Sequence, residues 1–213
     1  MTADIEIPEK KAFRSKPKKS KIPEYLVKET IDGIPFYYAG FRSVLNKTKT
    51  KTDIMADSGL QTVIKNYLLM LFFQHLDMSK YWAFTGEVGS HLDHRSNLAL
   101  DVAVYDKTIL TADKITTKYL DVTPKIVIEV DVRVEVDDRE AHIFDDFVLR
   151  KVRKLLEFGT EKIIWVFTKS KTIIVATPDN TWKIHDLDQE VEIMDGLTFN
   201  LARYFEQEGI SWS

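Results

Sequence analysis

The sequence predicts a single α/β domain in which a central mixed sheet is flanked by helices. Its 213 residues, of which 44% are hydrophobic, are enough for one sizeable core and too few for two ordinary domains. Two segments, residues 98–105 and 126–133, alternate apolar and polar side chains as half-buried strands do. A third segment, residues 163–167, is continuously apolar and follows a helical pattern, which is typical of a central strand.

The chain opens with a basic tail over residues 1–28, which we expect to be flexible, and continues as a single domain over residues 29–213. From residue 9 to residue 21 seven basic residues accompany one acid, a net charge of +6, so with −3 for the whole chain the remainder carries −9. Lysines attract phosphates over long distances. We therefore predict that Lys16, Lys18 and Lys19 bind nucleic acid, although a solvated, unstructured leader is the alternative explanation of such a run.

Cysteine usage and hydropathy bear on the compartment. The chain has no cysteine, which excludes disulfides and thiolate zinc sites and favours a reducing environment. The most apolar stretch, residues 67–73, is seven residues long, whereas a membrane span needs about 20. The N-terminus lacks the apolar region of a signal peptide. We expect a cytoplasmic protein without membrane contact.

The first elements of the domain are a hairpin and a long helix. Residues 29–40 place the turn signal Asp32-Gly33 between residues of high strand propensity, which predicts an N-terminal hairpin extension. After a link rich in lysine and threonine, a helix is expected over residues 57–76, with Asp57 or Ser58 as its N-cap. The second half of this helix is apolar all round, which predicts that it is buried between other elements.

The remaining elements alternate between strands and helices. A short strand leads into a loop rich in Gly, Ser, His and Asn, and the two alternating strands follow. The next helix is predicted to end at Gly159, because glycine suits the left-handed position after a helix. The apolar strand after it pairs through a short turn with a further strand, and a last helix closes the chain. These elements are expected at residues 81–88, 98–105, 126–133, 145–158, 163–167, 172–176 and 200–207.

Acidic residues occupy defined faces of the two alternating strands, because strand side chains alternate with a period of two. In residues 98–105 leucines and valines share one face and leave Asp101 on the other, between two alanines. In residues 126–133 Glu129 and Asp131 both point away from the apolar face. Unpaired carboxylates are costly in central strands, so this clustering implies a cation or a basic partner. A wet sheet face with ordinary salt bridges is the alternative.

One basic residue of the helix at residues 145–158 is expected to face the core. When side chains are placed at 100° intervals, Lys151 falls inside the apolar stripe, whereas the other basic residues lie on the opposite side. A lysine in this position either extends along its stem to the surface or meets an acid beneath the helix. If the helix packs over the strands, Asp101 and Glu129 are its natural partners.

An Asp, a Glu and a Lys on two strands and a covering helix are the groups that metal-assisted phosphodiester hydrolysis needs. Carboxylates hold a hard cation such as Mg²⁺, and an ammonium group stabilises the attacking water and the charge of the transition state. Gly-rich phosphate loops, GxSxG elbows and HExxH patterns are absent from the sequence, so nucleotide-binding, serine-hydrolase and zinc-protease sites lack support. Two carboxylates also suggest glycoside hydrolysis, which the core-facing lysine fits poorly.

Five segments carry a resemblance to a known family. They are IDGIPFYYAG, IMADSGLQ, ALDVAVYD, PKIVIEVDV and RKVRKLLEFGTEKIIWVFT. In this order they resemble the Uma2 family (DUF820), restriction-endonuclease-like proteins with the PD-(D/E)XK fold, and the resemblance extends roughly from residue 29 to residue 167. It implies a Mg²⁺- or Mn²⁺-dependent endonuclease that cleaves DNA. It also implies a homodimer, since nucleases that cut both strands often pair their active sites.

The resemblance implies catalytic roles for three residues. Asp101 matches the family's PD aspartate and Glu129 its EV glutamate, both expected to bind the metal, and Lys151 matches the lysine on the following helix. Glu87 is a further candidate metal ligand. Asp131 stands where the classical motif has its lysine, and we consider it an auxiliary acid that binds metal or pairs with an arginine.

A binding protein is the alternative to an enzyme. The same fold can serve as a non-catalytic binding module, for instance as the partner subunit of a defence system, because a fold does not fix a function. The acidic body of the chain favours this alternative, since affinity for DNA normally needs a basic groove.

Overall fold

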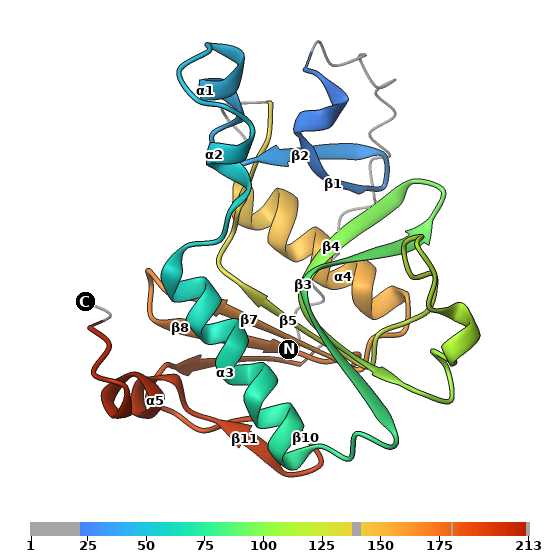
Figure 1. Ribbon diagram of the computed structural model, residues 1–213, viewed down its shortest axis with the longest axis vertical. Helices are drawn as coiled ribbons and strands as arrows, with labels where there is room; N and C mark the ends of the chain where they lie inside the picture. Colours follow the sequence, from blue (N-terminus) through green and yellow to red (C-terminus); the bar gives the residue numbers. More distant parts are fainter. Residues whose placement is uncertain (1–21, 138–141, 180, 212–213) are drawn as a thin grey trace, which may run out of the picture.

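The computed structural model describes residues 22–137, 142–179 and 181–211 (Figure 1). Within these residues the chain forms a nine-stranded sheet of order β6-β2-β1-β4-β5-β7-β8-β9, to which β3 is added by pairing with β4. The pair β5 and β7 is parallel, and the other pairs are antiparallel. Helices lie on both sides of this mixed sheet. The predicted fold class is therefore confirmed.

The elements have the following bounds. The strands are β1 (Val27–Ile31), β2 (Ile34–Tyr38), β3 (Tyr81–Asp93), β4 (Ser96–Asp106), β5 (Ile126–Val130), β6 (Val134–Glu135), β7 (Lys162–Phe167), β8 (Thr172–Ala176), β9 (Trp182–Asp186), β10 (Val191–Met194) and β11 (Leu197–Phe199). The α-helices are α1 (Phe41–Leu45), α2 (Thr52–Met55), α3 (Gly59–His75), α4 (Arg150–Glu157) and α5 (Leu201–Gln207); shorter turns are η1 (Glu24–Leu26), η2 (Ala112–Lys114) and the π-helical η3 (Phe144–Leu149). Across the described ranges, no helix combines the length and the apolarity that a membrane crossing requires.

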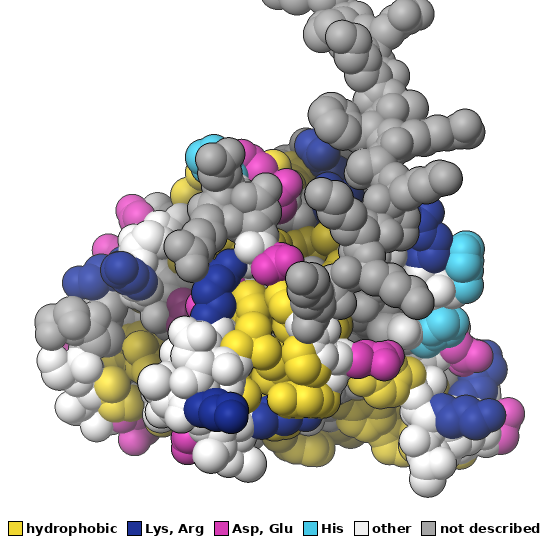
Figure 2. All heavy atoms as spheres, turned by 90° about the horizontal axis from the view of Figure 1, so that it is seen from above, with side chains coloured by type: hydrophobic (Ala, Val, Ile, Leu, Met, Phe, Trp, Pro, Cys, Tyr) yellow, Lys and Arg dark blue, Asp and Glu magenta, His cyan; other side chains and the backbone are white. Residues whose placement is uncertain are grey.

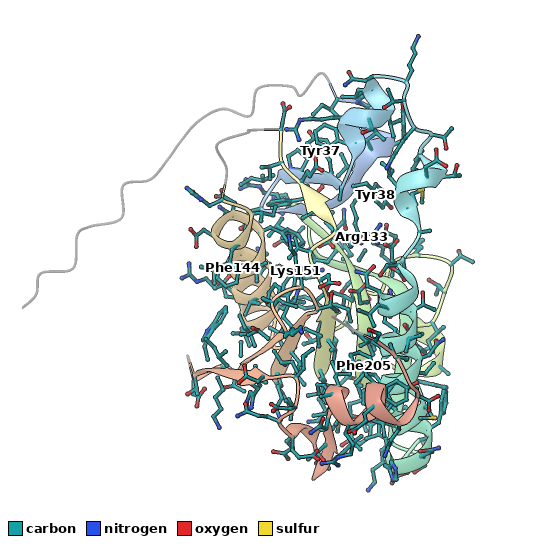
Figure 3. All side chains as sticks on the ribbon, turned by 90° about the vertical axis from the view of Figure 1, so that its left-hand side faces the viewer. Tyr37, Tyr38, Arg133, Phe144, Lys151 and Phe205 are labelled. Carbon is teal, nitrogen blue, oxygen red and sulfur yellow. The ribbon has the colours of Figure 1, made fainter. Side chains whose placement is uncertain are left out.

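Helices on the two faces of the sheet build two separate hydrophobic cores (Figure 3). On one face α3 packs together with α5 and the β10–β11 hairpin, and the ring of Tyr67 stacks on Tyr204 at 3.9 Å. On the other face η3 and α4 pack against the strands, and Phe147 meets the edge of Trp165 at 5.8 Å. A third, small cluster joins the N-terminal hairpin to α1 and α2. Its buried members are Leu26, Tyr37, Phe41 and Ile54.

Strand β4 positions the candidate site, because one of its edges pairs with two different strands, β1 and β5. Residues 102–104 pair with β5, whereas Asn97 pairs with Thr30 of β1. Between these two contacts β1 and β5 diverge. In the described strands, the edge of β4 at residues 98–101 has no ladder partner on this side. Side chains from several elements fill the resulting gap, and this gap is the site described below.

Three local predictions are confirmed. The hairpin predicted over residues 29–40 is β1 and β2, with Asp32 and Gly33 in left-handed conformations at its turn. Ser58 caps α3, because its hydroxyl accepts the Gln61 N–H at 3.2 Å while the Gln61 side chain accepts the Ser58 N–H at 3.0 Å. The helix predicted over residues 145–158 comprises η3 and α4, and it ends before Gly159, whose φ is +106°.

Two predictions about exposure and loops were wrong. The segment predicted as a loop after residue 88 stays extended, because β3 and β4 form a long hairpin in which His91 pairs with Asn97. The helix predicted to be buried all round, α3, lies on one face of the sheet, so its far side meets solvent. Met70 is 43% exposed and Phe73 60% exposed.

The predicted side-chain faces of β4 and β5 also needed correction. Leu98 and Leu100 pack in the core under α4, whereas Val102 and Val104 pack under α3. This change of face coincides with a bulge in β3, where the register of the hairpin shifts, and bulges increase local twist. Strand β5 ends at Val130 instead of residue 133, so strand alternation stops there.

The N-terminal boundary lies slightly earlier than residue 29. Strand β1 begins at Val27, directly after η1. Lys16, Lys18 and Lys19, which we predict to bind nucleic acid, lie outside the described residues.

Candidate active site

Lys151, which is labelled in Figure 3, lies at the centre of a buried group of carboxylates. Its side chain extends from α4 to the gap beside β4 and is fully buried. Its Nζ lies 2.9 Å from Oε2 of Glu129 and 3.0 Å from Oε1 of Glu29, and it donates to the carbonyl oxygen of Ala99 at 3.0 Å. An ammonium group has three protons, so all of them are directed at acceptors. The predicted pair of Lys151 and Glu129 is thus brought together, and Glu29 of β1 joins it.

Asp101 approaches the same group from β4. Its Oδ2 accepts the backbone N–H of Val130, the residue after Glu129, at 2.8 Å. The side chain therefore occupies the place of a ladder hydrogen bond where β4 and β5 separate. Its Oδ1 lies 3.2 Å from Nζ of Lys65, and the Thr85 hydroxyl donates to its backbone carbonyl at 3.0 Å. The three residues predicted to be catalytic therefore lie in one cluster.

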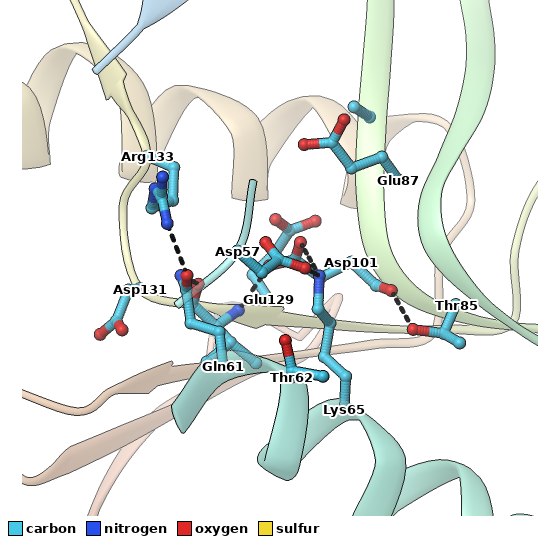
Figure 4. A network of polar contacts seen from close by, with 12 residues as sticks. Asp57, Gln61, Thr62, Lys65, Thr85, Glu87, Asp101, Glu129, Asp131 and Arg133 are labelled. Carbon is cyan, nitrogen blue, oxygen red and sulfur yellow. Dashed lines mark hydrogen bonds and ion pairs between the residues drawn. The ribbon is translucent and has the colours of Figure 1, made fainter. Parts of the chain in front are cut away.

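Lys65 of α3 is a second buried lysine in this cluster (Figure 4). Besides Asp101 it contacts Asp57, whose Oδ2 lies 2.5 Å from Nζ. The Asp57 side chain is 28% exposed, so Lys65 lies between a buried and a partly exposed carboxylate. One turn before it, Gln61 donates to the Val130 carbonyl at 2.9 Å. This bond attaches α3 to the end of β5 and thereby fixes the position of the helical turn that carries Lys65.

Acids outnumber lysines in this cluster. Four carboxylates share the two ammonium groups of Lys65 and Lys151. With every group ionised the cluster carries two excess negative charges, which one divalent cation would balance. The four acids are Glu29, Asp57, Asp101 and Glu129.

Burial and charge change the pKa values of the cluster. Burial raises the pKa of Glu129, Lys151 offsets this only in part, and the charges of Asp101 and Glu29 raise it further. Burial is also the main reason why the pKa of Glu29 is raised. For Lys151 and for Lys65, burial disfavours the charged form, but the neighbouring carboxylates outweigh it and raise both pKa values. Both lysines are therefore charged, while the acid excess is unfavourable.

Two buried carboxylate oxygens, Oε1 of Glu129 and Oε2 of Glu29, have no hydrogen-bond partner. Buried acceptors are rarely left unpaired, and a cation would satisfy them. Among the described residues, no group of three or more Asp, Glu or His side chains is arranged as a metal cage. Mg²⁺ usually needs only one or two carboxylates, because water and substrate phosphates complete its coordination. Asp101 and Glu129 fit a site of that kind.

Asp131 does not belong to the cluster. Its φ of +60° turns the chain at the end of β5, and its carboxylate accepts the Thr168 N–H at 2.7 Å and the Thr168 hydroxyl at 2.8 Å. The Trp165 indole donates to its carbonyl oxygen at 2.9 Å. Asp131 thus joins the ends of β5 and β7. The expectation that it shares a face with Glu129 was wrong, because the strand ends one residue earlier.

Glu87 lies beside the cluster and has another partner. It occupies the bulge of β3 with a φ of +59°, and its Oε1 lies 2.9 Å from Nζ of Lys28. Figure 4 shows its side chain apart from those of Asp101 and Glu129. In this arrangement its carboxylate is neutralised by Lys28 and holds the bulge against β1.

Sequence reasoning misses Glu29, Lys65 and Asp57. Lys65 could have been found by the argument that found Lys151, because it stands on the same helical face as buried apolar residues three and seven positions later. Glu29 offers a weaker signal. It lies in the hairpin that was predicted as an N-terminal extension, and only the pairing of β1 with the far half of β4 brings it to the gap.

Neither protein-family models nor curated proteins match this sequence. Among solved structures, the chain is similar to a crystal structure of a "putative nuclease belonging to DUF820" from Anabaena variabilis ATCC 29413. The TM-score is 0.61, the sequence identity is 14%, and the similarity covers 84% of this chain and 89% of the other. At this identity the likeness shows the fold. The chain therefore has the fold of a DUF820 protein, and its resemblance to the Uma2 family is confirmed at the level of the fold.

Proposed function

We propose that the protein is a Mg²⁺- or Mn²⁺-dependent endonuclease that hydrolyses the phosphodiester bonds of DNA. One observation carries the proposal: a buried cluster with an excess of acid, in which Glu129 and Glu29 each keep one carboxylate oxygen without a partner. The name of the structural neighbour, a "putative nuclease", supports the same class of reaction.

Asp101 and Glu129 would hold the cation, which when bound polarises the phosphoryl group and activates a water molecule. The chain already fixes both side chains. The Val130 N–H holds Oδ2 of Asp101, and Lys151 holds Oε2 of Glu129. Glu129 therefore presents its other oxygen, Oε1, whereas Oδ1 of Asp101 is held by Lys65, which a cation would have to displace.

The two lysines have different roles in this proposal. Lys151 assists by positioning, since it is fully buried and its protons are directed at Glu29, Glu129 and a carbonyl. Lys65 reaches towards the partly exposed Asp57. Once a cation replaces Lys65 at Asp101, the ammonium group of Lys65 can contact a substrate phosphate and stabilise the charge that develops there.

A non-catalytic binding module is the second candidate, and one contact favours it. Lys65 already neutralises Asp101, as an ion pair in a purely structural site would. A role as the partner subunit of a defence system, assembly as a homodimer and a cytoplasmic location stay predictions from the sequence.

The test combines cleavage with metal binding. Plasmid DNA is incubated with the full chain and Mg²⁺ or Mn²⁺, and Mn²⁺ binding is measured by calorimetry without DNA. We expect Asp101→Asn and Glu129→Gln to reduce cleavage by more than about 100-fold, the usual effect of losing an essential electrostatic group. Both variants should also weaken Mn²⁺ binding.

Asp131→Asn is the matched control, because it removes one negative charge from the neighbouring segment without touching the cluster. It should retain cleavage and metal affinity, and circular dichroism verifies that each variant is folded. If the wild type and the two cluster variants leave the DNA equally intact, the nuclease is rejected in favour of the binding module. If Asp131→Asn loses metal binding while folded, the assignment of ligands is wrong.

A further inference from the structure

The loop between α1 and α2, residues 46–51, carries an unusual set of lysines. Its sequence, NKTKTK, alternates Lys47, Lys49 and Lys51 with threonines. The first two lysines are exposed and the third is half-buried. We call residues 46–51 the basic loop. It lies at the end of the molecule that Figure 2 shows from above, where Lys and Arg side chains border a group of hydrophobic ones.

The backbone of the basic loop is held in place by its own hydrogen bonds. The N–H groups of Thr48 and Lys49 donate to the Ser43 carbonyl at 2.9 and 3.2 Å. The hydroxyl and the N–H of Thr50 both donate to Oδ2 of Asp53 at 2.7 Å. The threonines are therefore used within the loop, and the exposed side chains of Lys47 and Lys49 extend from a fixed backbone.

Within the described part of the chain, most lysines near the site are paired with acids, whereas those of the basic loop are not. Lys28, Lys65, Lys151 and Lys154 each form an ion pair with a carboxylate. Among the described residues, no ion pair includes a lysine of the basic loop. In a body with excess acid, three lysines within five residues that take part in none of these described ion pairs form a local positive patch, which is the charge that phosphates require.

Stacked side chains connect the basic loop to the acidic cluster. Nζ of Lys51 lies 5.9 Å from the ring centre of Tyr25 and 6.0 Å from that of Tyr38, within range of a cation–π contact. Lys28 lies over the same Tyr38 ring at 5.9 Å, and it immediately precedes Glu29 of the cluster. Lys51 of the loop and Lys28 beside the cluster therefore lie over the same Tyr38 ring, so the basic loop and the site are close in space.

A cleft of about 410 Å³ lies beside this path and includes Glu29. One of its walls is Tyr119, which is 57% exposed. This ring rests on Gly89 of β3, where a Cβ atom would come within 2.7 Å of the ring. The glycine therefore leaves room for the tyrosine to lie against the strand, with the rest of its ring open to the cleft. The cleft is lined by Glu24, Val27, Lys28, Glu29, Thr30, Asn97 and Tyr119.

We propose that the basic loop and this cleft bind one strand of a nucleic acid. The phosphates contact the lysines of the loop, and a base stacks on Tyr119 next to Glu29. Grooves for single strands combine basic residues that follow the backbone with exposed aromatic rings that stack on bases. The patch also explains how a negatively charged substrate reaches a negatively charged site. The inference that the nucleic-acid strand continues from the cleft to the acidic cluster rests on the proposed nuclease function. The inference that the strand binds to the basic loop and the cleft does not.

The test measures binding of a fluorescently labelled single-stranded oligonucleotide by anisotropy, in EDTA so that cleavage cannot occur. We expect the double variant Lys47→Ala/Lys49→Ala to bind about tenfold more weakly and to lower the slope of log affinity against log salt by about 1.4, since each contact to a single strand contributes about 0.7. Tyr119→Ala should weaken binding about fivefold or more, because one stacked base is lost.

The matched control is Lys169→Ala/Lys183→Ala, which removes the same charge from two exposed lysines elsewhere. The N-terminal tail is present in every protein, so its contribution cancels. Equal affinity of the loop variant and this control, or an unchanged affinity of Tyr119→Ala, overturns the proposal. Tighter binding of a duplex than of the single strand also overturns it.

The outcome is independent of the nuclease proposal. Asp101→Asn and Glu129→Gln should bind the oligonucleotide at least as well as the wild type, because they add no negative charge and leave the basic loop and the residues that line the cleft unchanged. If they abolish cleavage without weakening binding, both proposals are supported. If the wild type cleaves nothing yet the loop variant loses affinity, the nuclease proposal fails and the binding surface is retained.

Discussion

Lys151 and Lys65 enter the same acidic cluster from opposite faces of the sheet, and their surroundings differ. Lys151, from α4, is fully buried, and its two carboxylate partners, Glu29 and Glu129, are 2% and 5% exposed. Lys65, from α3, contacts the buried Asp101 at 3.2 Å and the partly exposed Asp57 at 2.5 Å. Both lysines are buried, but the partners of the first are buried too, whereas one partner of the second, Asp57, is partly exposed to solvent.

We infer from this difference that the ammonium group of Lys151 is a fixed part of the structure, whereas that of Lys65 can be displaced from Asp101. A buried lysine that neutralises two buried acids cannot leave without exposing both charges to a low dielectric. Displacing Lys65 from Asp101 costs less free energy. Asp101 keeps its hydrogen bond from the Val130 N–H, and Asp57 is partly exposed to solvent. We therefore expect a metal ion to compete with Lys65 and to depend on Lys151.

The largest expected effect is the loss of stability in Lys151→Met. Removing this lysine leaves Glu29 and Glu129 buried without their common partner, and breaking a buried ion pair typically costs about 3–5 kcal/mol. The free energy of unfolding in urea, measured above pH 8 where Glu129 is ionised, tests this prediction. Lys154→Met is the control, because that side chain is paired at the surface and should cost about 1 kcal/mol or less.

Glu29→Gln in the Lys151→Met background sharpens the result. It removes one of the two stranded charges while it keeps the shape of the side chain, so part of the lost stability should return. If Lys151→Met costs no more than Lys154→Met, the enclosed lysine is not the structural cation of the cluster.

The second prediction concerns pH, and its origin lies on the Lys151 side. Burial raises the pKa of Glu129 to about 8, above its usual 4.5, so near neutral pH the carboxyl holds a proton. A cation must displace this proton. Mn²⁺ affinity should therefore fall by up to about tenfold for each pH unit below 8 and level off above it. The pKa of Lys65 is raised from an already high value, so Lys65 does not titrate in this range.

Calorimetry in two buffers with different ionisation enthalpies counts the protons that are released. We expect close to one proton per Mn²⁺ at pH 7 in the wild type and none in Glu129→Gln. Equal proton release in the two proteins would show that the proton displaced by Mn²⁺ comes from a group other than Glu129.

The fold could largely be predicted from the sequence, because its signals are local. Alternation marked both central strands, Ser58 and Gly159 marked helix ends, and Asp32-Gly33 marked a hairpin. The errors arose where pairing overrides composition. Residues 89–95 are typical of a loop, but the ladder with β4 keeps most of them extended. Strand β5 ends early because Asp131 adopts a left-handed conformation, which alternation cannot reveal.

The candidate site could be predicted only in part, for the same reason. Asp101, Glu129 and Lys151 each break a regular pattern of their own element, so the sequence points to them. Glu29 and Asp57 interrupt no such pattern, and they reach the cluster through long-range pairing of β1 with β4 and through the link before α3. Lys65 does break a pattern, but the apolar run that follows it hides the face on which it lies.

The third prediction addresses the exchangeable lysine through Lys65→Met. An ammonium group 3.2 Å from Oδ1 of Asp101 competes with any cation for that oxygen. Without it, Mn²⁺ affinity should rise about tenfold, the effect of removing roughly 1.4 kcal/mol of competing charge interaction. The loss of stability should be smaller than in Lys151→Met. Calorimetry and urea unfolding measure the two quantities, and weaker Mn²⁺ binding in the variant would show that Lys65 does not compete with the ion.

The smallest expected effect has the opposite sign, and it comes from Asp57→Asn. Asp57 draws Lys65 away from Asp101, at 2.5 Å against 3.2 Å, so without its charge the lysine should associate more closely with Asp101. Mn²⁺ affinity should then fall a few-fold, about the effect of one partly exposed ion pair. Asp53→Asn removes the same charge from the preceding helix, where the carboxylate bonds only to Thr50 among the described residues, and it should leave Mn²⁺ affinity unchanged. Because Lys65→Met and Asp57→Asn disrupt one ion pair from its two ends, a general loss of charge or of fold would shift both affinities together. Opposite shifts require that Lys65 divides its charge between the two acids and yields Asp101 to the metal.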